Sequence, residues 1–304
     1  MEKVRVYCGV LFTLLIWSSD FILGKYLNQY LPPISSTMLR FLFAVIALAL
    51  LLAVKGEFQI PPKGIRLQLL VLGIIGIGIF NPLGYVALQY TSSINSALIN
   101  SMSPCATALL SFLFFRQRIT RTQGSCILIG IAGVVFVIMG NNGGSWNMNL
   151  GDALIVINVF LWASYNVFGK NVMKVITPLQ ASFYTCLAGL LFMIPMGSLG
   201  FRSISSPDEI NSMVWLSIAA MGVFGSCFGM YFWYCGIDRI GALNCSLLYN
   251  LIPFFTAVLA VAINGERLSA YHLIGGALII FSSFASILSQ KNNNFPVDTG
   301  KIDS

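Results

Sequence analysis

The sequence predicts an all-α integral membrane protein in which ten transmembrane helices form two inverted five-helix repeats, with both termini in the cytoplasm. Three observations lead to this fold class. Of the 304 residues, 57% are hydrophobic and only 9% are charged, whereas soluble domains carry about 25% charged residues. Apolar segments recur along the whole chain, and its first half is repeated in its second.

Each predicted span is an apolar segment of about 20 residues, the length that crosses a bilayer core about 30 Å thick. Short connections separate the spans, and turn signals such as Pro32-Pro33 and Pro61-Pro62 punctuate them. The predicted spans are 6–26, 34–54, 67–88, 93–115, 122–140, 151–170, 178–198, 212–235, 243–263 and 270–289.

The first apolar segment is predicted to be a retained helix. Lys3 and Arg5 precede it, as in a signal peptide, but the apolar run continues through residues 21–23 and no A-x-A site follows. At the other end, residues 292–304 are polar and are predicted to form a disordered cytoplasmic tail.

The positive charges indicate the orientation, because cytoplasmic loops are enriched in Lys and Arg. With a cytoplasmic N-terminus, the outer side carries only Lys25, Arg202 and Arg267, and Arg40 lies within a span. The cytoplasmic side then carries Lys3, Arg5, Lys55, Lys63, Arg66, Arg116, Arg118, Arg121, Lys170, Lys174, Arg239, Lys291 and Lys301. This asymmetry favours both ten spans and a cytoplasmic C-terminus.

An internal repeat divides the chain into residues 1–140 and 146–291. Residues 14–26 recur at 159–171 with an offset of 145, and later matches have an offset of 149. The matched pairs include Trp17 with Trp162, Gly24 with Gly169, Lys25 with Lys170, Gly76 with Gly225, Tyr85 with Tyr234, Pro104 with Pro253, and Arg118 with Arg267. Because five spans per repeat is an odd number, the second repeat enters the membrane from the opposite side. Many secondary transporters use such inverted repeats for alternating access, although a duplication that only builds a bundle is the alternative.

These motifs resemble the EamA-type drug/metabolite transporter superfamily across about residues 5–290. The resemblance rests on a Trp and a Lys eight residues later in the first helix of each repeat, on Arg40 early in the second helix, and on the turn 90–93. Pro104 and the run 265–267 (Gly-Glu-Arg) extend it. The resemblance implies movement of a small molecule across the cytoplasmic membrane without ATP-hydrolysing parts, and the sequence contains no G-x-x-x-x-G-K-[ST] motif.

The sequence also departs from this family pattern. Ser18 and Ala163 stand where the family often has Gly after the Trp, and Gln117 replaces the usual Glu of the first repeat. Asp20 places a carboxylate where a neutral residue is common. The substrate of any particular member therefore does not transfer to this chain.

Polar residues on one face of each repeat's first helix predict a shared cavity. One face of the first helix carries Thr13, Trp17, Asp20 and Gly24. The matching face in the second repeat carries Asn158, Trp162, Tyr165 and Gly169. Helix–helix packing is the alternative explanation.

Asp20 and Arg40 are the strongest signal in the spans. At a rise of 1.5 Å per residue, both lie about 7–8 Å below the outer surface, so pairing would offset the cost of placing charges in a membrane. The pair is purely structural, or Arg40 binds a substrate anion, or Asp20 takes up a proton during transport. Tyr165 and Thr185 occupy the equivalent positions of the second repeat, so the charge pair is one-sided.

Further candidates lie on the third, fourth, eighth and ninth spans. Asn81, Tyr85 and Gln89 form a stripe at four-residue steps, and Tyr234 is the repeat mate of Tyr85. Proline frees the carbonyl four residues earlier, here at Asn100 before Pro104 and at Tyr249 before Pro253, and polar Ser101 and Asn250 follow these positions. A kink satisfied by a neighbouring helix is the alternative.

The sequence contains no set of residues typical of an enzyme active site or a metal site. The seven cysteines lie singly without a C-x-x-C motif, and His272 is the only histidine. We therefore predict no enzyme, no cofactor, no metal site and no nucleic-acid partner.

Together these features predict a secondary transporter of the inner membrane for a small polar or amphipathic metabolite, such as an amino acid or a related compound. Export is favoured by the resemblance alone. A non-transporting membrane assembly partner or a lipid-movement subunit is the alternative, and proton coupling and oligomeric state stay open. The predicted substrate-binding residues are Trp17, Asp20, Arg40, Asn81, Tyr85, Gln89, Asn100, Trp162, Tyr165, Tyr234, Tyr249 and Asn250.

Overall fold

A computed structural model describes residues 2–115, 121–141, 148–169, 172, 175–201, 210–240, 245 and 248–292, and these ranges contain helices but no strand. The predicted all-α fold is confirmed. The first repeat contains α1 (Glu2–Leu27), α2 (Pro33–Lys55), α3 (Lys63–Gly73), η1 (Ile74–Ile79), α4 (Phe80–Ala87), α5 (Ser93–Asn100), α6 (Ser103–Phe115) and α7 (Arg121–Asn141). The second contains α8 (Leu150–Gly169), α9 (Pro178–Gly200), α10 (Ser212–Ala220), η5 (Met221–Phe228), α11 (Gly229–Ile240), α13 (Ile252–Asn264) and α14 (Ala270–Asn292).

The observed helices follow most of the predicted spans, but the ninth, predicted over 243–263, corresponds to the shorter helix α13, which begins at Ile252. Eight of them are long and apolar enough to cross a membrane, and two shorter apolar helices cover Ile252–Asn264 and Ala270–Ser286 within the described residues. The predictions made for Arg116, Gln117, Arg118, Lys170, Lys174, Arg202, Lys301 and the tail from residue 293 onward lie outside the described residues.

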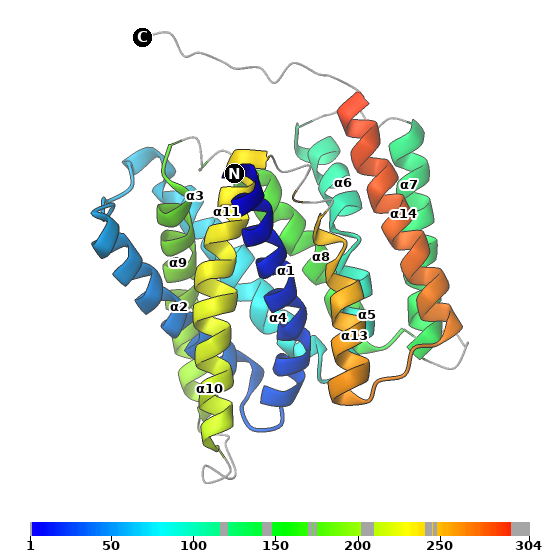
Figure 1. Ribbon diagram of the computed structural model, residues 1–304, viewed down its shortest axis with the longest axis horizontal. Helices are drawn as coiled ribbons and strands as arrows, with labels where there is room; N and C mark the ends of the chain where they lie inside the picture. Colours follow the sequence, from blue (N-terminus) through cyan, green and yellow to red (C-terminus); the bar gives the residue numbers. More distant parts are fainter. Residues whose placement is uncertain are drawn as a thin grey trace.

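The two repeats run in opposite directions. The helix α1 starts, and α14 ends, at the same end of the molecule (Figure 1). At the other end, Lys25 in the last turn of α1 bonds Glu266, and Glu266 in turn accepts a hydrogen bond from Ser93 at the start of α5. The first turn of α8 lies at this same end, because its Asp152 accepts a hydrogen bond from Thr91. The side on which the cytoplasm lies stays a prediction.

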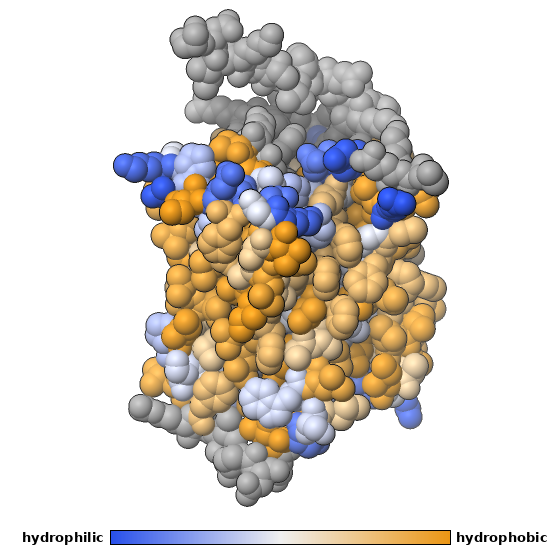
Figure 2. Space-filling view, turned by 60° about the vertical axis from the view of Figure 1, so that its left-hand side comes forward, coloured by the Kyte–Doolittle hydropathy of each residue, from blue (hydrophilic) through white to orange (hydrophobic). Residues whose placement is uncertain are grey.

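An apolar band crosses the middle of the face seen in Figure 2. In Figure 2 hydrophobic residues cover the central band of the visible face, and hydrophilic residues gather above and below it. Large apolar side chains such as Leu42, Ile46 and Leu191 are exposed on the middle turns of α2 and α9. A surface of this kind is suited to lipid and not to water.

A π-helical segment interrupts the third span of each repeat at matching positions. These segments, η1 and η5, are rich in glycine, and each faces the second span of the other repeat. A Cβ added at Gly73 would lie 2.5 Å from the backbone oxygen of Thr185, and one at Gly222 would lie 2.6 Å from that of Arg40. Both pairs are repeat mates, so the same backbone approach occurs twice. Only glycine permits so close an approach, and the repeats therefore interlock through these segments.

Candidate functional site

A cavity lies between the two repeats at the level of the π-helical segments. It contains about 750 Å³ of empty space, including the part that is continuous with solvent. Its walls come from α1, α2, η1, α4 and α5 of the first repeat, and from α8, η5, α11 and α13 of the second. Among the predicted site residues, those that line it are Trp17, Asp20, Arg40, Asn81, Tyr85, Asn100, Trp162 and Tyr249.

The remaining predicted residues lie elsewhere. Tyr165 and Tyr234 are buried and bond to each other, next to the cavity wall but not in it. Asn250 is buried and its amide has no hydrogen-bond partner among the described residues. Gln89 is exposed, because α4 ends at Ala87 and the chain turns before Gln89. Of the predicted stripe, only Asn81 and Tyr85 therefore lie on the helix.

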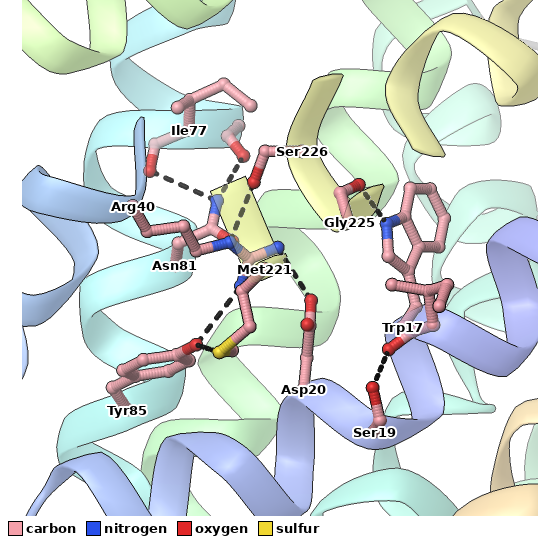
Figure 3. Close-up of polar contacts among 12 residues, drawn as sticks. Trp17, Ser19, Asp20, Arg40, Ile77, Asn81, Tyr85, Met221, Gly225 and Ser226 are labelled. Atoms are coloured by element: carbon pink, nitrogen blue, oxygen red, sulfur yellow. Dashed lines mark hydrogen bonds and ion pairs between the residues drawn. The ribbon is translucent and has the colours of Figure 1, made fainter. Parts of the chain in front are cut away.

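Arg40 is the centre of a buried polar network on the cavity wall. Its Nη2 donates to Asp20 Oδ2 at 2.6 Å, its Nη1 donates to the Tyr85 hydroxyl at 3.1 Å, and its Nε donates to Ser226 Oγ at 2.7 Å. Figure 3 shows the guanidinium between these three partners, which come from α1, α4 and η5. The ion pair that the sequence indicated is therefore formed, and Arg40 joins both repeats.

The second repeat contains a neutral counterpart of this network. The Tyr165 hydroxyl bonds Thr185 Oγ1 at 3.3 Å and also bonds the Tyr234 hydroxyl. These residues are the repeat mates of Asp20, Arg40 and Tyr85 by the two offsets found in the sequence. We call Asp20, Arg40 and Tyr85 the charged triad, and Tyr165, Thr185 and Tyr234 the neutral triad. The charged triad lines the cavity and the neutral triad does not.

Aromatic rings form the apolar part of the wall. The rings of Trp17 and Trp162 meet edge to face with centroids 5.7 Å apart, and Phe80 stacks on Trp162 at 5.1 Å. Tyr249 stacks on the same indole at 6.2 Å. Trp17 is held in place because its Nε1 donates to the Gly225 carbonyl at 3.0 Å. These rings give the cavity a flat-sided apolar compartment beside the charged triad.

Some lining residues were missed by the sequence analysis. Ser226, which binds Arg40, directly follows Gly225, and its repeat mate is the apolar Ile77. A polar residue at only one of two matched positions was a signal that could have identified Ser226 as a site residue. Phe80 and Phe41 were not singled out, because phenylalanine is too common in this chain to be informative.

The broken fourth span satisfies its own freed carbonyl. Helix α5 ends at Asn100 and α6 begins at Ser103, just before Pro104. The Ser103 hydroxyl donates to the Asn100 carbonyl oxygen at 2.5 Å. The backbone of Asn100 is therefore occupied, and its side chain is the part that lines the cavity.

A second polar cluster lies at the end of the molecule where α1 finishes. Glu266 accepts hydrogen bonds from Lys25 Nζ at 2.9 Å and from the backbone N–H groups of Ser93 at 3.1 Å and Ile94 at 3.2 Å. We call these four residues the Glu266 latch. It ties the end of α1, the start of α5 and the loop before α14 together. The described ion pair of Glu266 is the one with Lys25.

His272 belongs to a buried network beside this latch. Its Nε2 bonds Asn95 Oδ1 at 3.0 Å, and the Asn95 amide nitrogen donates to Asp152 Oδ1 at 3.3 Å. Thr91 donates to the same carboxylate oxygen at 2.5 Å. This network joins α5, α8 and α14 and does not reach the cavity walls.

Comparison with known proteins agrees with this architecture. Residues 4–139 and 149–288 match the model of the EamA-like transporter family, once in each repeat. The chain belongs to the EamA-like transporter family. The uncharacterized transporter YyaM of Bacillus subtilis is 32% identical over 284 residues, which cover 92% of each chain.

Another relative and a solved structure match this EamA-like transporter over most of its length. The uncharacterized inner membrane transporter YedA of Escherichia coli K12 is 26% identical over 280 residues, which cover 90% of this chain and 88% of YedA. A protein of known crystal structure has a TM-score of 0.68 and 20% identity, with 96% of this chain and 99% of the other covered, which supports the fold alone. The chain is a multi-pass transporter of the inner membrane, and a small molecule and the lipid bilayer are its partners.

Proposed function

We propose that this chain moves a small polar or amphipathic metabolite, such as an amino acid or a related compound, across the inner membrane by alternating access. Export is the proposed direction. The observation that carries the proposal is the cavity between the repeats, to which both repeats contribute walls. We take residues 1–140 and 146–291 as the two repeats, which exchange conformations so that one mouth of the cavity closes as the other opens.

The walls fit a solute with both polar and apolar parts. Trp17, Trp162 and Phe80 supply apolar faces, while Asn81 and Asn100 supply directional hydrogen bonds. Among the described residues that line the cavity, Arg40 and Asp20 are the only charged ones. This set is poor for a phosphate ester, which usually requires several Arg or Lys side chains.

The charged triad is the proposed moving part. Arg40 contacts η5 through Ser226 and α1 through Asp20, so a change in the angle between the repeats must alter this network. Uptake of a proton by Asp20 would release Arg40 from its partner and would couple transport to a proton gradient. We therefore include proton coupling in the proposal, as a step that a pH gradient across a vesicle tests.

The test is flux in proteoliposomes. A metabolite library is first screened for compounds that raise the melting temperature of the purified protein, since a ligand that binds only the folded state stabilises it. Radiolabelled hits are then followed in vesicles with and without a pH gradient. Saturable flux that falls at least tenfold in Tyr85→Phe is expected, and Tyr90→Phe, an exposed tyrosine near the same helix, is the matched control.

Two results would count against the proposal. Flux that does not saturate, or equal flux in Tyr85→Phe and wild type, would reject transport through this cavity. Lipid scrambling in the same vesicles without solute flux would favour the lipid-movement function instead.

A further inference from the structure

The cavity walls contain three buried oxygen atoms that have no hydrogen-bond partner among the described residues. They are Oδ1 of Asp20, Oδ1 of Asn100 and Oδ1 of Asn158, and all three residues line the cavity. Buried polar atoms are nearly always bonded, so each exception requires an explanation. Here the exceptions share one chemical property, because carboxylate and amide oxygens accept hydrogen bonds and cannot donate them.

The backbone fixes the direction of two cavity amides. Asn100 Nδ2 donates to the Ser96 carbonyl at 3.1 Å, and Asn81 Nδ2 donates to the Ile77 carbonyl at 3.2 Å. An amide turned the other way would place oxygen against oxygen in both cases. The nitrogens are therefore occupied, and the oxygens are the atoms left to meet a solute.

The cation of the cavity is already paired. Each of the three nitrogen atoms of Arg40 has a partner, and the closest is Asp20 at 2.6 Å. A solute carboxylate would compete with Asp20, which already neutralises the charge of the guanidinium. An N–H donor has no such competitor, because the second oxygen of Asp20 is free.

We infer that the solute is recognised through an amino group, which donates to Asp20 Oδ1 and to the amide oxygens of Asn100 and Asn158, while its apolar part lies against the aromatic rings. This inference rests on the proposed transport function and narrows its substrate to amphipathic amines. The oxygens are buried, so the amino group reaches them as the walls adjust around it. Trp17 and Trp162 then offer ring faces that attract a cation as well as apolar surface.

The asymmetry of the repeats sets the orientation of the amine. The carboxylate is on α1, and its repeat mate on α8 is Tyr165, which is neutral and bonded to Tyr234. The amino group therefore finds its counter-ion on α1, while the apolar end lies against Phe80 and Trp162.

The experiment compares three probes that share a 2-phenylethyl group: 2-phenylethylamine, phenylalanine and 3-phenylpropionate. Binding to the purified full-length protein is followed by tryptophan fluorescence, since Trp17 and Trp162 line the cavity. The amine is expected to bind at least tenfold more tightly than the acid. Equal or tighter binding of the acid would overturn the inference, and so would binding of phenylalanine alone, because the amino group would then be insufficient.

Variants locate the recognised group. Asn100→Leu is expected to weaken amine binding about tenfold and Asn100→Asp to strengthen it, with Tyr90→Phe unchanged. Asn100 lies outside the charged triad, so these variants do not depend on the fate of the ion pair. Unchanged amine affinity in both Asn100 variants would overturn the assignment.

Flux separates this inference from the proposed function. Selective amine binding without flux of labelled 2-phenylethylamine in proteoliposomes would reject transport and leave the recognition chemistry in place. Saturable flux of another solute, without preference for the amine over the acid, would reject the amine and leave transport in place.

Discussion

The charged triad and the neutral triad hold the same three helices of each repeat together with different chemistry. Both connect the first, second and third spans through matched positions, and both use a tyrosine of the third span. The neutral triad achieves this with hydroxyl groups alone. The junction therefore needs no charge to hold it, and a buried ion pair is in any case weak evidence for stability. We infer that the charge of the first triad serves the cavity that it lines.

The largest effect is expected from breaking the ion pair. Arg40→Thr removes the partner of Asp20, whose side chain is only 13% exposed. Breaking a buried pair in this way costs about 3–5 kcal/mol. We therefore expect a steep fall in the melting temperature of the detergent-solubilised protein, measured by fluorescence-detected gel filtration after heating.

The double variant Asp20→Tyr/Arg40→Thr sharpens this comparison, because it copies the neutral triad into the first repeat. It should recover most of the stability lost by Arg40→Thr and still lose transport by at least tenfold. A double variant as unstable as the single one would show that the two junctions are not equivalent. A stable double variant with normal flux would show that the charge does not serve the cavity.

The next largest loss of stability is expected at the two glycines that pack against the triads, Gly76 against Tyr165 and Gly225 against Asp20. A Cβ at Gly76 would overlap the ring of Tyr165, whereas at Gly225 the nearest neighbour, Asp20 Oδ1, would be 3.3 Å away. Gly76→Ala should therefore destabilise the protein by about 1–3 kcal/mol, the usual range for overpacking, and Gly225→Ala by less. Melting curves of the two variants measured side by side test this order, and equal losses would contradict it.

A smaller effect is expected inside the neutral triad. Thr185→Val removes the hydroxyl that bonds Tyr165 and keeps the shape of the side chain. A neutral hydrogen bond contributes about 0.5–1.5 kcal/mol, so the melting temperature should fall slightly and flux should persist. Loss of transport in a stable Thr185→Val would mean that the neutral triad also has a role in the cycle. Ser164→Ala, on the exposed face of α8, is the matched hydroxyl control.

The pairing of Asp20 with Arg40 was predictable because it needed only helix geometry. Counting residues from the outer end of two neighbouring spans placed both charges at one depth, and pairing follows from the cost of leaving either alone. The two repeat offsets likewise identified the members of the neutral triad, although their bonds to one another required coordinates.

Other features of the site required the three-dimensional structure. A π-helical turn inserts residues into a helix and rotates every face after it, so the position of Ser226 toward Arg40 does not follow from α-helical spacing. Gln89 was placed on a stripe that assumes a helix continuing beyond Ala87. Tyr249 lines the cavity and the next residue, Asn250, does not, a distinction that could not be counted from sequence.

The contrast between the repeats extends to the loops, because Gln117 is the repeat mate of Glu266. Burial alone would raise the pKa of Glu266, but hydrogen bonds from Lys25 and from the N–H groups of Ser93 and Ile94 outweigh burial and hold the pKa below its ordinary range. A carboxyl whose folded pKa is lowered adds stability above its unfolded pKa of about 4.3. That stability is lost as the pH falls through the lower folded value.

Glu266→Gln gives the latch the residue of the other repeat and should have the smallest effect. At pH 7 the variant should be less stable by no more than about 1 kcal/mol, because Lys25 is partly exposed and such pairs contribute little. As the pH falls from the unfolded pKa of about 4.3 through the lower folded value, the wild-type carboxyl takes up a proton, so the melting curves of the two proteins should converge. Arg267→Gln, in the same loop and exposed, should show no such convergence with pH. A gap between wild type and Glu266→Gln that stays constant from pH 7 to pH 3.5 would mean that the charge of Glu266 does not hold the latch.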